Sequence, residues 1–274
     1  MAAWRVVRNH IFLPNERPRK YDVPILGSDP ERRIQQMNDS RPTTSRDSEN
    51  KVYFDRWSES YDQGRISPWF QYTQRLTIDL LKLKPGARVL DVGCGTGYAV
   101  RYLGQLDDVE KACGIDISAG MVEAAQEQVS PDLVDKIQFV EASSDDIPFP
   151  DDEFDHVICT NSFHHYPDPV KALKEMQRVL KSGGQIVIFE NAPDLSWYTW
   201  GWDRLLRIIE KGHVKYYTCK ELEAILKGAG LESLELCHYK NEFMKHGKLF
   251  ASIQVWSALV PQKNTNKESV QASS

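Results

Sequence analysis

Short apolar runs alternate along the middle of the chain with segments whose apolar residues recur every three or four positions. Short runs bounded by turn residues are typical of buried strands, whereas the longer period is typical of helices with one buried face. Strands that alternate with helices indicate a mostly parallel sheet covered on both faces, and therefore the α/β class. The predicted strands are residues 88–92, 112–116, 137–140, 156–160 and 185–190.

Capping residues mark the helices that lie between and after these strands. A helix of residues 98–106 is predicted directly after the first strand. Ser118, Asp168 and Thr218 each stand where the N-cap of a later helix is expected, because their side-chain oxygens can accept hydrogen bonds from the first backbone N–H groups of a helix. The first strand and its helix are thus joined by the turn of residues 93–97, which is rich in glycine.

The two ends of the chain differ from the middle. Residues 1–48 carry five prolines and little periodicity, which predicts an irregular N-terminal arm. Residues 262–274 are polar, which predicts a flexible tail. The predicted domain between them, residues 49–261, ends in two β-like runs, residues 231–238 and 249–260, which we interpret as an antiparallel hairpin at one edge of the sheet.

Composition excludes several classes of protein. No apolar run approaches the ~20 residues of a membrane-spanning helix, and the formal charge of −5 argues against a nucleic-acid partner. The five cysteines never have C-x-x-C spacing, so we predict reduced thiols and no metal site. We expect a cytoplasmic protein that acts on a small molecule. Homo-oligomerisation stays open, as does a transit peptide in the first residues.

The glycine-rich turn is the most informative motif. Residues 89–98 read V-L-D-V-G-C-G-T-G-Y, with glycines at Gly93, Gly95 and Gly97 after the acid Asp91. Glycine tolerates positive φ and lets a ligand approach the backbone closely. A second acid, Asp116, ends the next strand, where a ribose diol needs an acceptor. The third glycine comes one residue earlier than in a dinucleotide fingerprint, so the turn suits a nucleoside without phosphates and disfavours a nicotinamide oxidoreductase.

This turn resembles the first motif of the Rossmann-like S-adenosylmethionine-dependent methyltransferases, and the likeness extends over about residues 50–260. E-A-S-S-D-D-I-P-F at 141–149 is similar to the family's adenine-binding segment, and L-K-S-G-G at 180–184 is similar to its turn into the fifth strand. The nearest group is the ubiquinone/menaquinone C-methyltransferase-like one. The resemblance implies S-adenosylmethionine as cofactor and a seven-stranded, mostly parallel sheet with an antiparallel C-terminal hairpin.

The resemblance also implies roles for individual residues. Asp91 lies near the methionine part of the cofactor in such enzymes, Asp116 takes the ribose hydroxyls, and the backbone N–H of Ser144 meets the adenine. Ser143 stands where many members carry an acid or an amide, which implies a weaker contact, with help from Asp145. The predicted cofactor-binding residues are Asp91, Gly93, Gly95, Thr96, Gly97, Asp116, Ile117, Ser143, Ser144, Asp145, Thr160, Asn161 and Tyr61.

An aromatic stripe precedes the domain's first strand. Tyr53, Trp57 and Tyr61 are spaced i, i+4 and i+8, which by spacing alone favours burial in the core. The segment also resembles the family's entrance helix, which covers the cofactor. That likeness makes Tyr61 a candidate for the carboxylate end of the cofactor, and Tyr53 or Trp57 a candidate for packing near the sulfonium.

Two adjacent histidines are the candidates for a general base. His164 and His165 follow the fourth strand, at the carboxyl edge where open α/β sheets hold their ligands. Histidine titrates near neutral pH and could deprotonate a phenol, an enol or an amine. If one of them acts, we prefer His165. A purely structural role, as a cap or a bond to a loop carbonyl, remains the alternative for each.

A stretch rich in aromatic residues follows the fifth strand, within an insertion at residues 191–217. Trp197, Trp200, Trp202 and Tyr216 are the candidate substrate-binding residues, because aromatic faces accept flat or hydrophobic ligands. Burial against the sheet or in a dimer contact is the alternative. The expected acceptor is hydrophobic or aromatic, with C- or O-methylation favoured over N-methylation. A catalytically inactive cofactor-binding partner on the same fold is the competing hypothesis.

Overall fold

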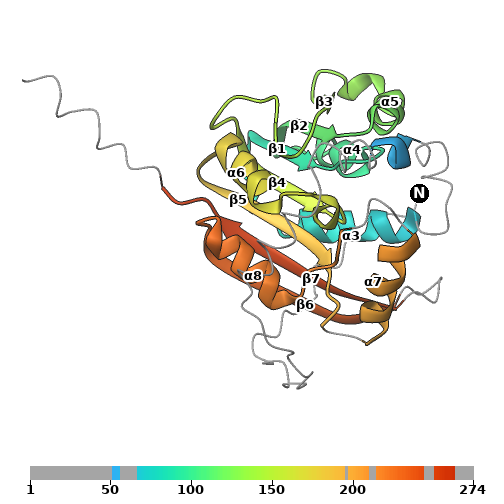
Figure 1. Cartoon of the computed structure of the whole chain (residues 1–274). Helices are drawn as coiled ribbons and strands as arrows, with labels where there is room; N and C mark the ends of the chain where they lie inside the picture. The colour runs from blue at the N-terminus through green and yellow to red at the C-terminus, as the bar shows by residue number, and fades with distance from the viewer. Residues whose placement is uncertain (1–50, 56–66, 195–196, 210–213, 244–249, 263–274) are drawn as a thin grey trace, which may run out of the picture. The chain divides into compact units, whose positions relative to one another are not determined.

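A seven-stranded sheet organises the fold, and its strand order is β3-β2-β1-β4-β5-β7-β6 (Figure 1). Strands β1 to β5 pair in parallel, whereas β7 pairs antiparallel with both β5 and β6. The predicted fold class and the C-terminal hairpin are therefore confirmed. The strands are β1 (Ala87–Val92), β2 (Val109–Asp116), β3 (Ile137–Glu141), β4 (Phe154–Thr160), β5 (Leu180–Asn191), β6 (Glu232–Phe243) and β7 (Phe250–Leu259).

This computed structural model describes residues 51–55, 67–194, 197–209, 214–243 and 250–262. The described residues all belong to one compact unit, residues 38–274. Among the residues described, no helix has the length and apolar character needed to cross a membrane. Trp57 and Tyr61 lie outside the described residues, as do the predicted arm and all but the first residue of the predicted tail.

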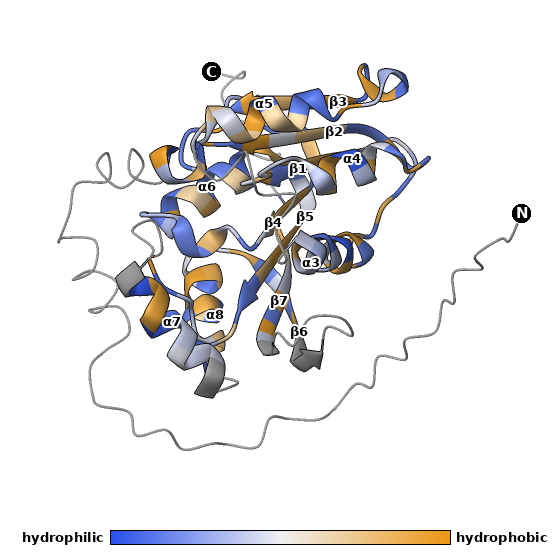
Figure 2. Cartoon of the chain, turned by 90° about the vertical axis from the view of Figure 1, so that its right-hand side faces the viewer, coloured by the Kyte–Doolittle hydropathy of each residue, from blue (hydrophilic) through white to orange (hydrophobic). Residues whose placement is uncertain are grey.

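Helices cover the sheet on both faces. Helices α3, α4 and α5 contribute to one apolar core with β1 and β2, while α6 packs on β5 and against α8. Figure 2 shows α3 and α4 on one side of the strands, and α6 and α8 on the other. The helices are α3 (Ser67–Asp79), α4 (Tyr98–Gly104), α5 (Ala119–Glu127), η2 (Pro131–Leu133), η3 (Phe163–His165), α6 (Pro169–Val179), α7 (Trp197–Ile209) and α8 (Cys219–Gly228).

The three predicted N-caps are confirmed. The Ser118 side chain accepts the Met121 N–H and so begins α5. Asp168 accepts two backbone N–H groups at the start of α6. Thr218 forms a capping box with Glu221 at the start of α8, so local side-chain chemistry sets where these helices begin.

Several strand boundaries and one helix differ from the sequence prediction. Strand β2 begins three residues earlier than expected, because the polar residues Glu110 and Lys111 separate its buried first residue, Val109, from the apolar run. Strand β5 begins at Leu180 rather than residue 185 and runs through Gly183, which has a φ of +72°. Helix α3 was not predicted. Its buried face includes the polar residues Thr73, Gln74 and Thr77, which hide the apolar period on which the prediction relied.

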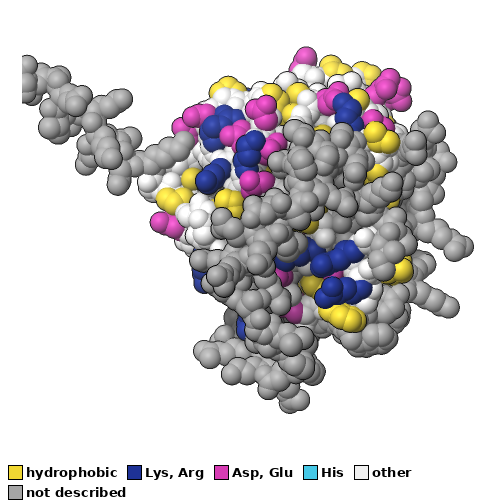
Figure 3. Space-filling model, viewed as in Figure 1, with side chains coloured by type: hydrophobic (Ala, Val, Ile, Leu, Met, Phe, Trp, Pro, Cys, Tyr) yellow, Lys and Arg dark blue, Asp and Glu magenta, His cyan; other side chains and the backbone are white. Residues whose placement is uncertain are grey.

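Acidic and basic side chains intermix on the described surface. Figure 3 shows Lys and Arg side chains beside Asp and Glu side chains on its upper part. Arg178, for example, pairs with both Asp151 and Glu175. Such exposed pairs contribute little to stability.

Candidate functional site

The glycine turn joins β1 to α4 through three residues of left-handed conformation. Gly93, Gly95 and Gly97 have φ values of +77°, +52° and +76°. A Cβ atom on Gly93 would lie 1.9 Å from Ser162 Oγ, and one on Gly97 would lie 2.4 Å from the Phe139 ring. Glycine is therefore required at both positions by conformation and by space. The N–H groups of Gly93 and Cys94 both donate to the Ile115 carbonyl, which ties the turn to β2.

Two carboxyl groups, the buried Asp91 and the half-buried Asp116, lie next to this turn. Asp91 is 2% exposed, and its Oδ1 has no hydrogen-bond partner among the described residues. Burial, reinforced by the charge of Asp116, raises the pKa of Asp91 to about 8. Asp116 accepts the Gly95 N–H at 2.9 Å and the Ser118 N–H at 3.0 Å. Burial also raises the pKa of Asp116, although these two hydrogen bonds partly offset it.

The end of β4 turns its polar side chains toward α3. Thr160 donates to Thr77 Oγ1 at 3.2 Å, and Asn161 Nδ2 donates to Thr73 Oγ1 at 2.7 Å. Asn161 has a φ of +55°, and within the described chain its Oδ1 is buried without a donor. Two unsatisfied acceptors, on Asp91 and Asn161, thus follow neighbouring strands at one edge of the sheet. Unpaired buried acceptors are costly, so this edge is suited to a ligand that donates hydrogen bonds.

The predicted adenine-binding residues follow β3 and are half-buried. Ser143 Oγ donates to Asp145 Oδ1 at 2.7 Å, and Lys171 Nζ donates to Asp145 Oδ2 at 2.9 Å. Burial alone would raise the pKa of Asp145, but these two hydrogen bonds outweigh it and lower the pKa. Asp145 is thus held by the chain's own groups. Ile117 is half-buried after β2, and Thr96 is buried within the glycine turn.

The helical segment 51–55 lies along the ends of β2 and β3. Asp55 Oδ1 accepts the Ser118 hydroxyl at 2.6 Å and the Gly120 N–H at 3.2 Å, and Lys51 pairs with Glu141. Figure 1 shows the segment in blue near α5. Since Asp116 and Glu141 pair in register at the ends of β2 and β3, the segment is placed to cover the predicted ribose site.

The two candidate bases have different surroundings. His164 is 5% exposed, and its Nδ1 lies 3.0 and 2.9 Å from the two carboxylate oxygens of Glu190, at the end of β5. His165 is half-buried, and its ring packs edge-on against Phe54, with centroids 5.0 Å apart. Sequence reasoning missed Glu190 and Phe54. The available signal for Glu190 was an acid directly after the apolar run of residues 186–189.

The predicted substrate-binding residues divide into two groups. Trp200 and Trp202 of α7 are 55% and 44% exposed, whereas Tyr216 is buried with its ring 4.8 Å from that of His164. The Trp197 side chain lies outside the described part of the structure. The Thr199 hydroxyl accepts the Ser252 N–H at the start of β7, and β7 pairs antiparallel with β5. Helix α7 therefore stands at the carboxyl edge of the parallel strands.

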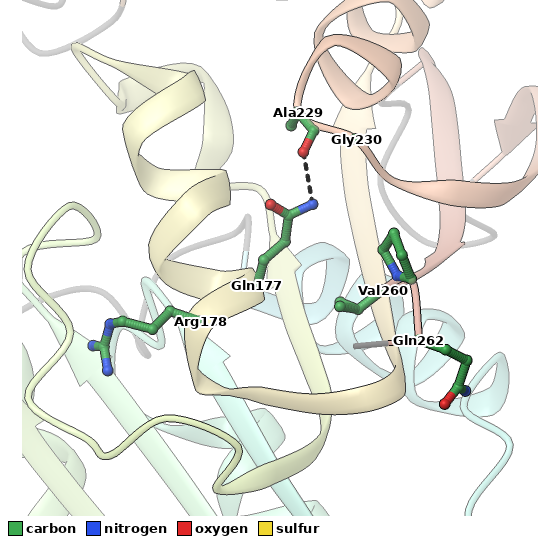
Figure 4. Close-up of a pocket in the computed structure, with 7 residues that line it drawn as sticks. Gln177, Arg178, Ala229, Gly230, Val260 and Gln262 are labelled. Carbon is green, nitrogen blue, oxygen red and sulfur yellow. Dashed lines mark hydrogen bonds between the residues drawn. The ribbon is translucent and has the colours of Figure 1, made fainter. Parts of the chain in front are cut away.

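A pocket of about 400 Å³ lies at the opposite edge of the sheet. Its lining includes Gln177 and Arg178 near the end of α6, with Val260 and Gln262 after β7 (Figure 4). Ligands of open α/β sheets bind at the carboxyl ends of the strands. This pocket is therefore not part of the candidate site.

Comparisons with known proteins identify the family. Residues 90–188 match the model of a methyltransferase domain. The 27-O-demethylrifamycin SV methyltransferase of Amycolatopsis mediterranei is 34% identical over 186 residues, which cover 64% of this chain and 68% of that enzyme. The chain belongs to the S-adenosylmethionine-dependent methyltransferases.

Other relatives agree with this assignment. The demethylmenaquinone methyltransferase of Listeria monocytogenes is 29% identical over 150 residues, which cover 53% of the present chain and 63% of the Listeria enzyme. The match therefore spans less than two thirds of that relative. A Haloferax volcanii methyltransferase, solved in complex with the Trm112 methyltransferase activator, superposes with a TM-score of 0.65 at 21% identity. That superposition covers 76% of this chain and 98% of the other, and it supports the fold alone.

The residues present fit the family's cofactor. S-adenosylmethionine is a cation whose amino group donates hydrogen bonds, and the unsatisfied acceptors on Asp91 and Asn161 are the kind of group that it needs. The left-handed glycines leave the space that side chains would fill. The turn thus suits a ligand lying against the backbone.

We expect the affinity for S-adenosylmethionine to increase between pH 6 and pH 8. Burial and Asp116 raise the pKa of Asp91 to about 8, so below that pH the empty site holds a proton that a cationic ligand must displace. Affinity should then rise by up to about tenfold per pH unit. Calorimetry in two buffers of different ionisation enthalpy at pH 7 should detect the released proton. An affinity that is flat from pH 6 to pH 8 would contradict this coupling.

Proposed function

We propose that this methyltransferase transfers a methyl group from S-adenosylmethionine to a small hydrophobic or aromatic acceptor, on carbon or oxygen. The observation that carries the proposal is that three large apolar side chains, Trp200, Trp202 and Leu205, are exposed on the helix that follows β5. Large apolar side chains left exposed next to a ligand site favour apolar ligands. The relatives named for a rifamycin and for a menaquinone support the same class of acceptor.

The proposed roles of the cofactor residues follow from their positions. Asp91 and Asn161 receive the methionine end, because they offer buried acceptors. Asp116 receives the ribose hydroxyls at the end of β2. The half-buried residues 143–145 after β3 border the adenine. The segment 51–55 then covers the ribose side.

The chemistry places few demands on the protein. S-adenosylmethionine supplies a methyl group that its sulfonium already activates. The chain's residues must orient the acceptor, exclude water and remove a proton where the nucleophile carries one. In this proposal the aromatic side chains of α7 serve the first two tasks, and His164 or His165 serves the third.

A panel assay tests the proposal. Purified protein with methyl-labelled S-adenosylmethionine is offered quinones, phenols, amines, a polar peptide and tRNA, and label should enter quinones or phenols. Trp202→Ala should raise KM for the acceptor by about tenfold, because it removes apolar contact area. Val134→Ala is the matched control, since Val134 is 56% exposed beside η2, after α5 rather than in the insertion.

Two outcomes would contradict the proposal. If the label enters the peptide or tRNA in preference to quinones and phenols, the acceptor is not a small hydrophobic or aromatic molecule. The protein could also label no compound in a cell extract although S-adenosylmethionine raises its melting temperature. That result would favour a cofactor-binding protein without catalytic activity. An equal thermal shift with a nicotinamide dinucleotide would count against the cofactor assignment itself.

A further inference from the structure

Glu190 is a buried acid at the carboxyl end of β5. Its side chain is fully buried, and its two oxygens lie 3.0 and 2.9 Å from His164 Nδ1. The Glu190 carboxylate also accepts the backbone N–H of His164 at 3.1 Å. Glu190 therefore contacts both the ring and the main chain of His164.

A carboxylate on one ring nitrogen decides which tautomer a histidine adopts. An ionised carboxylate only accepts hydrogen bonds, so the His164 proton must sit on Nδ1. Nε2 then carries the ring's lone pair. The same arrangement orients bases and metal-binding histidines in other sites.

A second buried histidine, which also contacts a residue of β5, shows what a structural histidine looks like in this fold. His156 at the other end of β4 lies 3.2 Å from the Gln185 amide oxygen on β5. Burial lowers the pKa of His156 despite the nearby Asp155. At the amino edge of the sheet, the uncharged amide of Gln185 holds His156. At the carboxyl edge, where ligands bind, the carboxylate of Glu190 holds His164.

The segment after α7 packs against His164, which also contacts Glu190. The Val214 N–H donates to the His164 carbonyl at 3.1 Å, and the Tyr216 ring packs against the His164 ring at 4.8 Å. The Tyr216 N–H in turn donates to Asp203 of α7 at 2.7 Å. The helix proposed to bind the acceptor is thereby connected to the histidine through two residues.

We propose that Glu190 is the positioning residue that holds His164 as the general base of the methyl transfer, an inference that rests on the proposed function. The acceptor's proton passes to His164 Nε2, and the electron pair left on the acceptor is the nucleophile. The imidazolium formed is stabilised by the Glu190 carboxylate, and it later returns its proton to solvent. His165, with its ring against Phe54, is a neighbour of this pair.

The groups around His164 define its pH response. Glu190 faces it from β5, the His165 ring lies 4.0 Å away on η3, and Tyr216 covers it. One contact further, Asp203 holds the Tyr216 N–H, and Lys215 pairs with Glu221. Glu190 is an acid in direct contact with the ring, so removing its charge should have a specific effect.

The first test is the pH–rate profile of Glu190→Gln in the full chain, with the best acceptor of the panel. Glutamine keeps the shape and an acceptor oxygen but loses the charge. We expect kcat to fall by about 10²-fold and the acidic limb of the profile to move to lower pH, because the imidazolium loses its counter-ion. The Kd for S-adenosylmethionine should stay unchanged. A profile that falls in height without moving would assign Glu190 a structural role only.

Matched histidine variants separate catalysis from folding. His164→Gln should lose about 10²-fold or more in kcat, whereas His156→Gln should change the melting temperature without changing kcat. His165→Gln is the competing variant. If His165→Gln abolishes turnover and His164→Gln does not, the base is His165 and the proposal is wrong.

A tautomer measurement makes the proposal testable without any acceptor. In protein labelled with ¹⁵N-histidine, the His164 signal should show a protonated Nδ1 and an unprotonated Nε2 at pH 8, and Glu190→Gln should perturb it. A His164 protonated on Nε2 would overturn the inference, even if methyl transfer is found. The expected tautomer in a protein that methylates no acceptor would instead refute the proposed function and leave the positioning contact standing.

Discussion

Asp91→Asn is expected to raise the melting temperature of the cofactor-free protein while lowering its affinity for S-adenosylmethionine by about 10²-fold. The first effect follows from burial. The pKa of Asp91 stands at about 8 in the folded chain, because burial and Asp116 both oppose ionisation. An asparagine fills the same volume without that cost, so the empty protein should gain of the order of 1 kcal/mol or more at neutral pH.

The sign of the pH dependence follows from the same shift. A free aspartate has a pKa of about 3.9, so between about pH 4 and pH 8 the unfolded chain is ionised while folded Asp91 keeps its proton. The stability that Asp91 contributes below pH 4 is therefore lost as the pH rises toward 8. The advantage of Asp91→Asn should grow over that window, and thermal melts at pH 5, 6, 7 and 8 would measure it.

Asp155→Asn is the control of opposite sign. Burial alone would raise the pKa of Asp155, but hydrogen bonds from Lys181 and the Arg88 N–H outweigh it and lower the pKa. Its replacement should lower the melting temperature and leave cofactor affinity alone. If Asp91→Asn lowers the melting temperature of the cofactor-free protein at pH 8, then the buried, unpaired carboxyl of Asp91 does not destabilise the fold as we infer.

Gly97→Ala is expected to destabilise the protein by about 2–4 kcal/mol, the sum of a left-handed backbone penalty and overpacking. The new Cβ would lie 2.4 Å from the Phe139 ring and 2.9 Å from Ala125 Cβ, at a φ of +76°. The Phe139 ring belongs to the buried face of β3, so it has little room to yield. Urea denaturation gives the change from the shift in midpoint at constant slope.

Gly201→Ala is the matched control, because a Cβ there meets nothing within 4 Å and the residue lies inside α7. It should stabilise the protein by about 0.5–1 kcal/mol through helix propensity. Adding Phe139→Leu to Gly97→Ala should recover the part of the loss that comes from the Phe139 ring, and leave the backbone penalty and the contact with Ala125. A Gly97→Ala protein as stable as the wild type would show that the turn can adopt another conformation.

The parts of the fold that local chemistry specifies were predictable from the sequence. Ser118, Asp168 and Thr218 cap helices where expected, because an N-cap depends on residues two or three positions away. The left-handed glycines of the turn were predictable for the same reason. Buried strands with near-continuous apolar runs were located to within a few residues.

The contacts that define the candidate site were less predictable, because they join residues distant in the chain. Glu190 meets His164 across 26 positions, and Asn161 meets Thr73 across 88. Helix α3 was missed because its buried face carries two threonines and a glutamine, and the threonines hydrogen-bond to Thr160, Asn161 or their own helix rather than packing as apolar residues. Polar burial of this kind leaves no periodic signal in a single sequence.

The way in which segment 51–55 is held has a consequence for turnover. Two of its described attachments are polar, since Asp55 caps the start of α5 and Lys51 forms a half-exposed ion pair with Glu141, and a third is the edge-on packing of Phe54 against His165. Polar contacts of this kind are individually weak and are screened by salt. We therefore expect salt to loosen the polar part of this cover, which would help spent cofactor to leave and fresh cofactor to enter while the sheet stays intact.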